Sequence, residues 1–189
     1  MEVDIVSGLS LTDKAISFAA RAHRHQTRKA SDTPYISHPY SVAMLLQKAG
    51  CEEELVVAGL LHDTLEDTET TEKELLEAFG PRVLELVKGC SEPDKSLSWE
   101  ERKQHTIDTL KTAPQDICLV TCADKLHNIR TLIEDRKALG DTLWARFNRG
   151  KDKQAWYYTS ILSVLSVNLA HHSLVQALKE EISNLFYYN

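Results

Sequence analysis

Apolar residues recur at helical spacing along most of this chain, and this pattern restricts the fold more than any other feature. Ala15, Ile16, Ala19 and Ala22 lie at intervals that place them on one face of a helix. No run alternates between apolar and polar residues over a useful length, so the sequence predicts no β-sheet. We therefore expect an all-α fold, a compact bundle of helices.

Capping signals indicate where the helices begin and end. Residues 71–74 and 98–101 have the wording of capping boxes, and Pro39 is expected at the first position of a helix that Gly50 ends. The expected helices are 12 to about 26, Pro39 to Gly50, one that starts at 52–54 and carries His62-Asp63, a short one between Gly80-Pro81 and Gly89, 116–139, 151–170 and 173–187, with a polar loop at 90–97.

The composition is that of an ordinary soluble enzyme. With 189 residues, 42% of them hydrophobic and 26% charged, the chain is expected to form one domain, 1–189, with its motifs at about 12–165 and C-terminal helices to 187. No stretch is long and apolar enough to span a membrane, and the N-terminus lacks the basic start of a signal peptide. The net charge of −6 argues against nucleic-acid binding.

Cysteine usage favours a reducing compartment. The four cysteines are too sparse for a disulfide framework, so we expect a cytoplasmic protein. Cys118 and Cys122 lie one helical turn apart in the apolar run 117–123, and we expect them to be core thiols rather than metal ligands.

The strongest chemical signal is residues 60–67, Leu-Leu-His-Asp-Thr-Leu-Glu-Asp. His62 and Asp63 offer one nitrogen and one oxygen to a borderline metal ion at the end of an apolar helical run. Glu66 and Asp67 follow within about one turn, on nearly the same side of the helix. A group that orients or deprotonates a water would be needed at that position, so the segment predicts a hydrolytic metal site.

Two further segments complete the candidate metal site. His38 lies in Pro-Tyr-Ile-Ser-His-Pro at 34–39, and Asp124 lies in Ala-Asp-Lys-Leu-His-Asn at 123–128. Two imidazoles and two carboxylates suit Mn, Fe or Zn better than Mg or Ca. Four protein ligands on an ion that accepts six leave room for water and a substrate oxygen. Each of these residues alone could be a capping or buried polar residue, but together they predict a metal centre.

This constellation resembles the HD superfamily of metal-dependent phosphohydrolases, and the longer wording resembles the hydrolase domain of RelA/SpoT homologues, most closely the single-domain small alarmone hydrolases. The resemblance covers most of 12–165. It rests on His23-Arg24-His25-Gln26-Thr27-Arg28-Lys29, Thr33-Pro34-Tyr35-Ile36-Ser37-His38-Pro39, His62-Asp63-Thr64-Leu65-Glu66-Asp67-Thr68, Phe79-Gly80 and Ala123-Asp124-Lys125-Leu126-His127-Asn128. It implies an all-helical HD-domain bundle, one Mn²⁺ per chain ahead of Zn or Fe, and removal of the 3′-diphosphate from (p)ppGpp.

The resemblance also implies roles for individual residues. The ion would activate a water, Glu66 and Asp67 would orient it or take its proton, and Arg28 and Lys29 would neutralise the leaving diphosphate. Because the chain ends at Asn189, without room for a synthetase domain, we expect it to degrade alarmones and not to make them.

The remaining substrate contacts are expected in the second half of the chain. Asp124, Asn128 and Thr131 are spaced i, i+4 and i+7 and form one helical stripe, whereas Lys125 points about 100° away from it. The segment 144–151 resembles the family's segment near the nucleotide, in which Trp144 or Phe147 could stack on a base. It adds two candidate phosphate contacts, Arg146 and Lys151. Tyr157 or Tyr158 could donate to phosphate, and we expect Trp156 to be packed in the core.

Several alternatives stay open. The segment 29–34 and the loop 88–92 depart from the family wording, so adenine alarmones such as (p)ppApp, or the 2′-phosphate of NADPH, are alternative substrates. A non-catalytic HD module that senses nucleotides or binds a partner is a second class, although the full ligand set favours an enzyme. A nucleoside 5′-phosphatase is a third. The sequence is silent on oligomeric state, and a homo-oligomer is left open.

Overall fold

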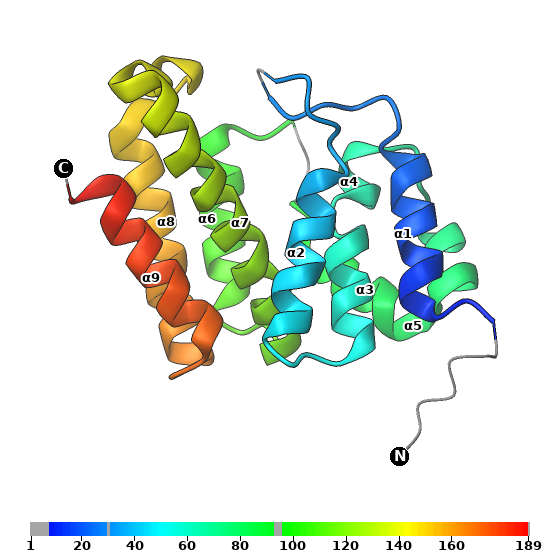
Figure 1. The fold of residues 1–189 in the computed structure, drawn as a ribbon. Helices are drawn as coiled ribbons and strands as arrows, with labels where there is room; N and C mark the ends of the chain where they lie inside the picture. The colour runs from blue at the N-terminus through cyan, green and yellow to red at the C-terminus, as the bar shows by residue number, and fades with distance from the viewer. Residues whose placement is uncertain (1–7, 30, 93–95, 189) are drawn as a thin grey trace. The chain divides into compact units, whose positions relative to one another are not determined.

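The structure is a computed structural model that describes residues 8–29, 31–92 and 96–188 (Figure 1). Within those ranges it contains helices and no strand, apart from one isolated bridge between Thr27 and Pro34. This confirms the all-α expectation. The chain divides into two compact units, 1–88 and 89–189, and each is described by itself. No helix in the described ranges is long and apolar enough to cross a membrane.

The first unit contains α1 (Leu11–Ala22), α2 (Ser37–Lys48), α3 (Glu53–Leu61), α4 (Thr64–Asp67) and most of α5 (Glu72–Cys90). Helix α3 packs against both α1 and α2, and every residue of it from Leu55 to Leu61 is buried. A helix that is apolar all round is stable only where neighbours cover it on several sides. The central position of α3 is therefore what its sequence requires.

Gly59 lets α2 and α3 approach closely. A Cβ atom built at this glycine would lie 2.7 Å from Cδ1 of Leu46 and 3.2 Å from Cα of Ala43. Both neighbours belong to α2, which carries His38, whereas α3 leads directly into His62. The absence of a side chain at Gly59 therefore sets the distance between the two elements that hold the histidines.

The predicted helix signals are mostly confirmed. Thr71 and Glu74 exchange the hydrogen bonds of a capping box, as do Ser98 and Glu101. A third capping box, Ser10 with Asp13, begins α1 and was not predicted. Gly80, at φ 82°, interrupts α5 as the Gly80-Pro81 pair indicated.

The second unit contains α6 (Trp99–Leu110), α7 (Gln115–Leu139), the 3₁₀ segment η1 (Gly140–Arg146), α8 (Gly150–Asn168) and α9 (Ser173–Phe186). Helix α7 packs mainly on α9, and α8 packs on both α6 and α9. The core thiols Cys118 and Cys122 are fully buried on α7, as expected. Burial raises the pKa of the Cys122 thiol to about 12.

Three local expectations were wrong. Helix α2 begins at Ser37, so Pro39 is its third residue; a turn in which the His38 amide donates to the Tyr35 carbonyl starts the helix early. His62 and Asp63 lie between helices, as the C-cap of α3 and the N-cap of α4, rather than inside one helix. Trp156 is 37% exposed rather than packed in the core, and its ring lies 6.1 Å from that of Trp99.

Candidate metal centre and active site

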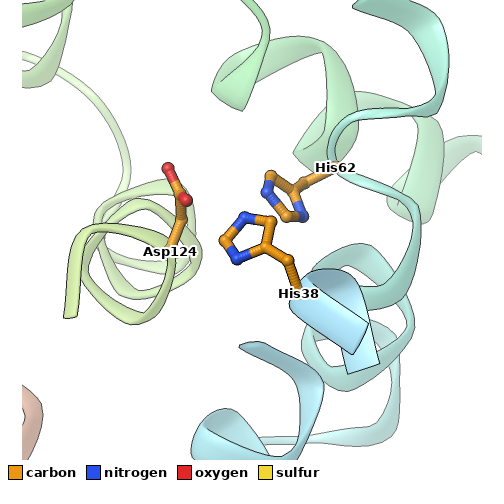
Figure 2. A group of neighbouring side chains, drawn as sticks. All are labelled: His38, His62 and Asp124. Carbon is orange, nitrogen blue, oxygen red and sulfur yellow. The ribbon is translucent and has the colours of Figure 1, made fainter. Parts of the chain in front are cut away.

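Two buried histidines face one another in the first unit. His38 is the second residue of α2 and His62 follows the last residue of α3. Figure 2 shows their imidazole rings pointing toward one another, and the ring centroids are 5.2 Å apart. A ligand nitrogen of each lies within 4.8 Å of the other. The close packing of α2 on α3 thus brings together two predicted ligands that are far apart in the sequence.

Asp63 adds an oxygen to the same point. Its Oδ2 lies 3.1 Å from Nε2 of His62 and 3.7 Å from Nε2 of His38. The hydroxyl of Tyr35 donates a hydrogen bond of 2.7 Å to this oxygen. Two imidazole nitrogens and one carboxylate oxygen therefore converge, and three of the four predicted metal ligands lie together within one unit.

The backbone fixes which nitrogen of His62 faces the site. Its Nδ1 lies 2.9 Å from the carbonyl oxygen of Gly59. Because a carbonyl can only accept, Nδ1 carries the proton, and Nε2 presents its lone pair on the side of Asp63. Metal-binding histidines in proteins are usually held in this way by a second hydrogen bond. The donor set, its convergence and this orientation fit a divalent metal that prefers mixed nitrogen and oxygen ligands.

The predicted acid–base residues lie on the short helix that Asp63 caps. Glu66 and Asp67 are both half-buried on α4. The Asp67 amide donates to the Asp63 carbonyl at 2.9 Å, and the buried Thr64 hydroxyl donates to the Leu61 carbonyl at 2.6 Å. These bonds tie α4 to the end of α3, so both carboxylates follow the predicted ligands His62 and Asp63 without an intervening loop.

The predicted diphosphate contacts lie on a loop between α1 and α2 that is closed by backbone hydrogen bonds. The amide of Arg28 donates to the Thr33 carbonyl at 2.9 Å, and the guanidinium carbon of Arg28 lies 5.6 Å from the centroid of the Tyr35 ring. Lys29 is exposed. Arg28 is therefore held next to the tyrosine that contacts Asp63.

In the second unit, α7 presents the predicted stripe. Asp124, also labelled in Figure 2, is buried, and its carboxylate accepts from Nδ2 of Asn128 at 2.5 Å and from Nζ of Lys125 at 2.7 Å. The Thr131 hydroxyl donates to the Asn128 carbonyl at 2.7 Å. Asp124, Asn128 and Thr131 are thus linked to one another by hydrogen bonds along α7. The ammonium of Lys125 also reaches Asp124, which its direction on the helix did not predict.

A cationic cluster around Tyr157 was missed by the sequence analysis. The ammonium groups of Lys103 and Lys125 lie 4.9 and 5.8 Å from the centroid of the buried Tyr157 ring. Glu92 accepts from Arg102 at 2.6 Å and also from Lys103. Burial alone would raise the pKa of Glu92, but the nearby Lys103, Lys125 and Arg102 together hold it below its usual value.

The acidity of Tyr157 and Lys103 is shifted by the same environment. Burial raises the pKa of the Tyr157 hydroxyl, so it stays protonated as a donor at neutral pH. Burial, with help from the nearby Lys125, lowers the pKa of Lys103. The sequence offered little signal for Lys103 because α6 is strongly polar, and a lysine on a polar helix normally lies in solvent.

The other predicted substrate contacts, Arg146 and Lys151, each have a partner within the second unit. Arg146 pairs with Asp135 at 3.6 Å, and the Lys151 ammonium lies 5.9 Å from the centroid of the Trp144 ring. The Trp144 ring packs on Phe186, with centroids 5.6 Å apart, and the residue is buried. Trp144 is therefore a core residue rather than a surface on which a base could stack.

Comparison with known proteins agrees with this geometry. Residues 15–149 match the HD domain family. Over 122 residues the chain is 42% identical to the zebrafish (Danio rerio) guanosine-3′,5′-bis(diphosphate) 3′-pyrophosphohydrolase MESH1, covering 63% of this chain and 67% of that protein. It is also 42% identical over 132 residues to a GTP pyrophosphokinase of Myxococcus xanthus, covering 66% of this chain but only 17% of that protein.

The fold is shared with a solved structure of similar length. A metazoan ortholog of SpoT that hydrolyses ppGpp superposes with a TM-score of 0.79 at 27% identity, covering 97% of this chain and 99% of that one. The family match spans the predicted metal ligands, Arg28 and Lys29, and the acid–base pair. This chain belongs to the HD domain family, in the group that includes MESH1 and the RelA/SpoT homologues.

Proposed function

We propose that this chain hydrolyses the 3′-diphosphate of (p)ppGpp-type alarmones and releases pyrophosphate with GDP or GTP. The observation that carries the proposal is the convergence of His38, His62 and Asp63, in a chain 42% identical to a MESH1 3′-pyrophosphohydrolase. The similarity in fold to the ppGpp-hydrolysing SpoT ortholog supports the same substrate class.

We propose Mn²⁺ as the ion, one per chain, held by His38, His62, Asp63 and Asp124. The first three already converge, and Asp124 would add a second carboxylate, which is buried. Two imidazoles with two carboxylates suit Mn²⁺ better than Mg²⁺ or Ca²⁺. When bound, such an ion supplies Lewis-acid chemistry, polarising a phosphoryl oxygen and making the attacking water more acidic.

Glu66 and Asp67 are proposed to handle the proton. The oxygen of a water forms a bond to the phosphorus of the 3′-phosphate while the bond from that phosphorus to the ribose 3′ oxygen breaks. A carboxylate takes the proton from the water, and the 3′ oxygen of the product acquires one. Both carboxylates lie on the short helix capped by Asp63, which keeps them next to the metal ligands.

Side chains of the protein are proposed to bind the two ends of the anionic substrate. Arg28 and Lys29 neutralise the 3′-diphosphate as negative charge develops on it. Lys151, Arg146 and Tyr157 are proposed to meet the 5′ end.

In the second unit, the Asp124 stripe supplies further contacts. Asn128 and Thr131 offer hydrogen bonds to the sugar or a phosphate. Lys103 and Lys125, beside Tyr157, add two cations that can attract a polyanion although the whole chain carries a net charge of −6.

We also propose that the protein works in the cytoplasm on a small nucleotide, without a nucleic-acid partner. The net charge of −6 opposes binding to a nucleic-acid backbone. The small number of cysteines suits a reducing compartment.

The test is a product assay with four substrates. The Mn-loaded protein is incubated separately with ppGpp, ppApp, NADPH and dAMP, and both pyrophosphate and phosphate are quantified. We expect pyrophosphate from ppGpp, no phosphate from dAMP, and loss of all turnover in His62→Ala. Phosphate from NADPH or dAMP, with no pyrophosphate from ppGpp, would overturn the proposed reaction.

A further inference from the structure

Tyr35 lies between the predicted metal ligands and a buried histidine that has no assigned role. Its hydroxyl donates to Oδ2 of Asp63 at 2.7 Å, and this is the same oxygen that faces Nε2 of His62 and Nε2 of His38. A hydrogen bond to a carboxylate oxygen restricts the rotation of that carboxylate. Tyr35 thereby fixes the direction in which Asp63 presents its oxygens to the two imidazoles.

The position of Tyr35 is itself determined from several sides. Its ring centroid lies 5.0 Å from that of His23 and 5.9 Å from that of His38. Its amide donates to the Gln26 carbonyl at 2.9 Å, and its own carbonyl accepts from the His38 amide at 2.9 Å. A side chain held by two rings and two backbone bonds has little freedom to move its hydroxyl away from Asp63.

His23 and Gln26 connect Tyr35 to the end of α4 through a ring contact and two hydrogen bonds. His23 is only 2% exposed, and its Nδ1 lies 2.7 Å from the Oε1 of Gln26, so this nitrogen carries the proton and donates to the amide oxygen. The amide nitrogen of Gln26 in turn donates to the backbone carbonyl of Asp67. His23 therefore contacts one residue that holds Asp63 and another that holds the end of α4.

We propose that Tyr35 and Gln26 are positioning residues, supported on His23, that orient the metal ligand Asp63 and the proton-handling segment Glu66–Asp67 respectively. The inference rests on the proposed metal-dependent hydrolysis. Tyr35 acts on Asp63 and Gln26 acts on the Asp67 backbone, so the two should affect different steps. Loss of the Tyr35 hydroxyl should weaken metal binding, whereas loss of the Gln26 amide should slow the chemical step.

The test compares three variants by Mn²⁺ titration calorimetry without substrate and by kinetics at saturating Mn²⁺. Tyr35→Phe should raise the Kd for Mn²⁺ by about 10- to 100-fold, which is the usual effect of removing a residue that hydrogen-bonds to a metal ligand. Excess Mn²⁺ should restore most of its kcat. Gln26→Met should keep the Kd within about threefold and lower kcat by on the order of 10-fold, since small misplacements of reacting groups have large effects on rate.

Tyr40→Phe is the matched control, because Tyr40 is a tyrosine on α2 that is 46% exposed. It should leave both the Kd and kcat within about twofold of the parent. A Tyr35→Phe protein that binds Mn²⁺ as tightly as Tyr40→Phe would overturn the role of Tyr35, even if its thermal stability fell. A Gln26→Met protein with full kcat would overturn the role of Gln26 in positioning Glu66 and Asp67.

Failure of the proposed function gives a different result from failure of this inference. If the parent binds Mn²⁺ but releases no pyrophosphate from ppGpp, the substrate assignment is wrong while the Kd comparison still decides the role of Tyr35. If the parent binds no divalent ion at all, Asp63 is not a ligand and the inference is overturned together with the metal site.

Discussion

Gly59→Ala is the substitution that most directly probes how the fold builds the candidate metal site. The new Cβ would lie 2.7 Å from Cδ1 of Leu46, and 3.2 and 3.3 Å from Cα and N of Ala43. Leu46 is fully buried, and the Ala43 contacts are to backbone atoms, so the conflict cannot be relieved by a side chain swinging into solvent. We expect α2 and α3 to separate slightly, and His38 to move away from His62.

Two opposing effects set the size of the loss. Overpacking a well-packed core typically costs about 1–3 kcal/mol. Replacing glycine by alanine inside a helix returns roughly 0.5–1 kcal/mol through backbone entropy. The net destabilisation should be about 0–2.5 kcal/mol, which lowers the Tm of a chain of this size by at most about 10 °C. Because metal sites tolerate only small displacements of their ligands, the Kd for Mn²⁺ should also rise.

A double mutant separates the steric mechanism from general destabilisation. Leu46→Val alone removes buried carbon and should cost about 1 kcal/mol. In Gly59→Ala/Leu46→Val the new methyl group occupies the space that Cδ1 leaves while the Ala43 backbone contacts remain, so the pair should cost less than the sum of the two single variants. Thermal unfolding and Mn²⁺ titration of the four proteins measure this coupling. Strictly additive losses, or a Gly59→Ala protein more stable than the parent, would refute the close approach as its cause.

The other predictions concern the site and one core thiol. Mn²⁺ at about 100 times its Kd should raise the Tm of the parent by roughly 5–11 °C, from about 2.7 kcal/mol of binding free energy, and His62→Ala should show no rise in a thermal scan. Glu66→Gln should retain Mn²⁺ in metal analysis but lose about 10²–10⁴-fold in rate; turnover within about threefold of the parent would make Glu66 structural. Arg28→Ala should lower kcat and kcat/KM together for ppGpp, whereas Lys151→Ala should raise KM alone; the reverse pattern would mean that the nucleotide lies the other way round. Cys122, whose pKa burial raises to about 12, should resist iodoacetamide at pH 8 until denaturant is added, and rapid modification of the native protein in peptide mapping would contradict its burial.

The helices were predictable because the signals that define them are local. Capping boxes at Thr71 and Ser98, the glycine break at Gly80 and the apolar spacing of α1 each depend on residues within one or two turns. The start of α2 was placed two residues late because its first turn is closed by bonds in which the carbonyls of Pro34 and Tyr35 accept from the amides of Ser37 and His38.

Residue chemistry and motif similarity were enough to predict His38, His62, Asp63 and Asp124 as candidate metal ligands, but not the geometry in which they lie. Nothing local to His38 indicates that it meets His62, because their proximity depends on the packing of α2 against α3 at Gly59. The link from Tyr35 to Asp63 is a contact between residues 28 positions apart and could not be read from spacing. Sequence indicated which chemical groups could form the candidate site, while tertiary packing determines which of them touch.

Lys125 illustrates why long side chains escape pattern-based reasoning. A helical wheel describes the direction of Cβ, and by that measure Lys125 diverges from the stripe that contains Asp124 and Asn128. A lysine side chain has four carbons beyond Cα, enough to bend its ammonium back to a neighbouring carboxylate, and Nζ lies 2.7 Å from Asp124. Burial makes that pairing necessary, because an ammonium removed from water needs an anionic partner. Lys103 follows the same rule with Glu92. The burial of a lysine is therefore best predicted from the carboxylates that its side chain can reach, and only then from its position on the helix.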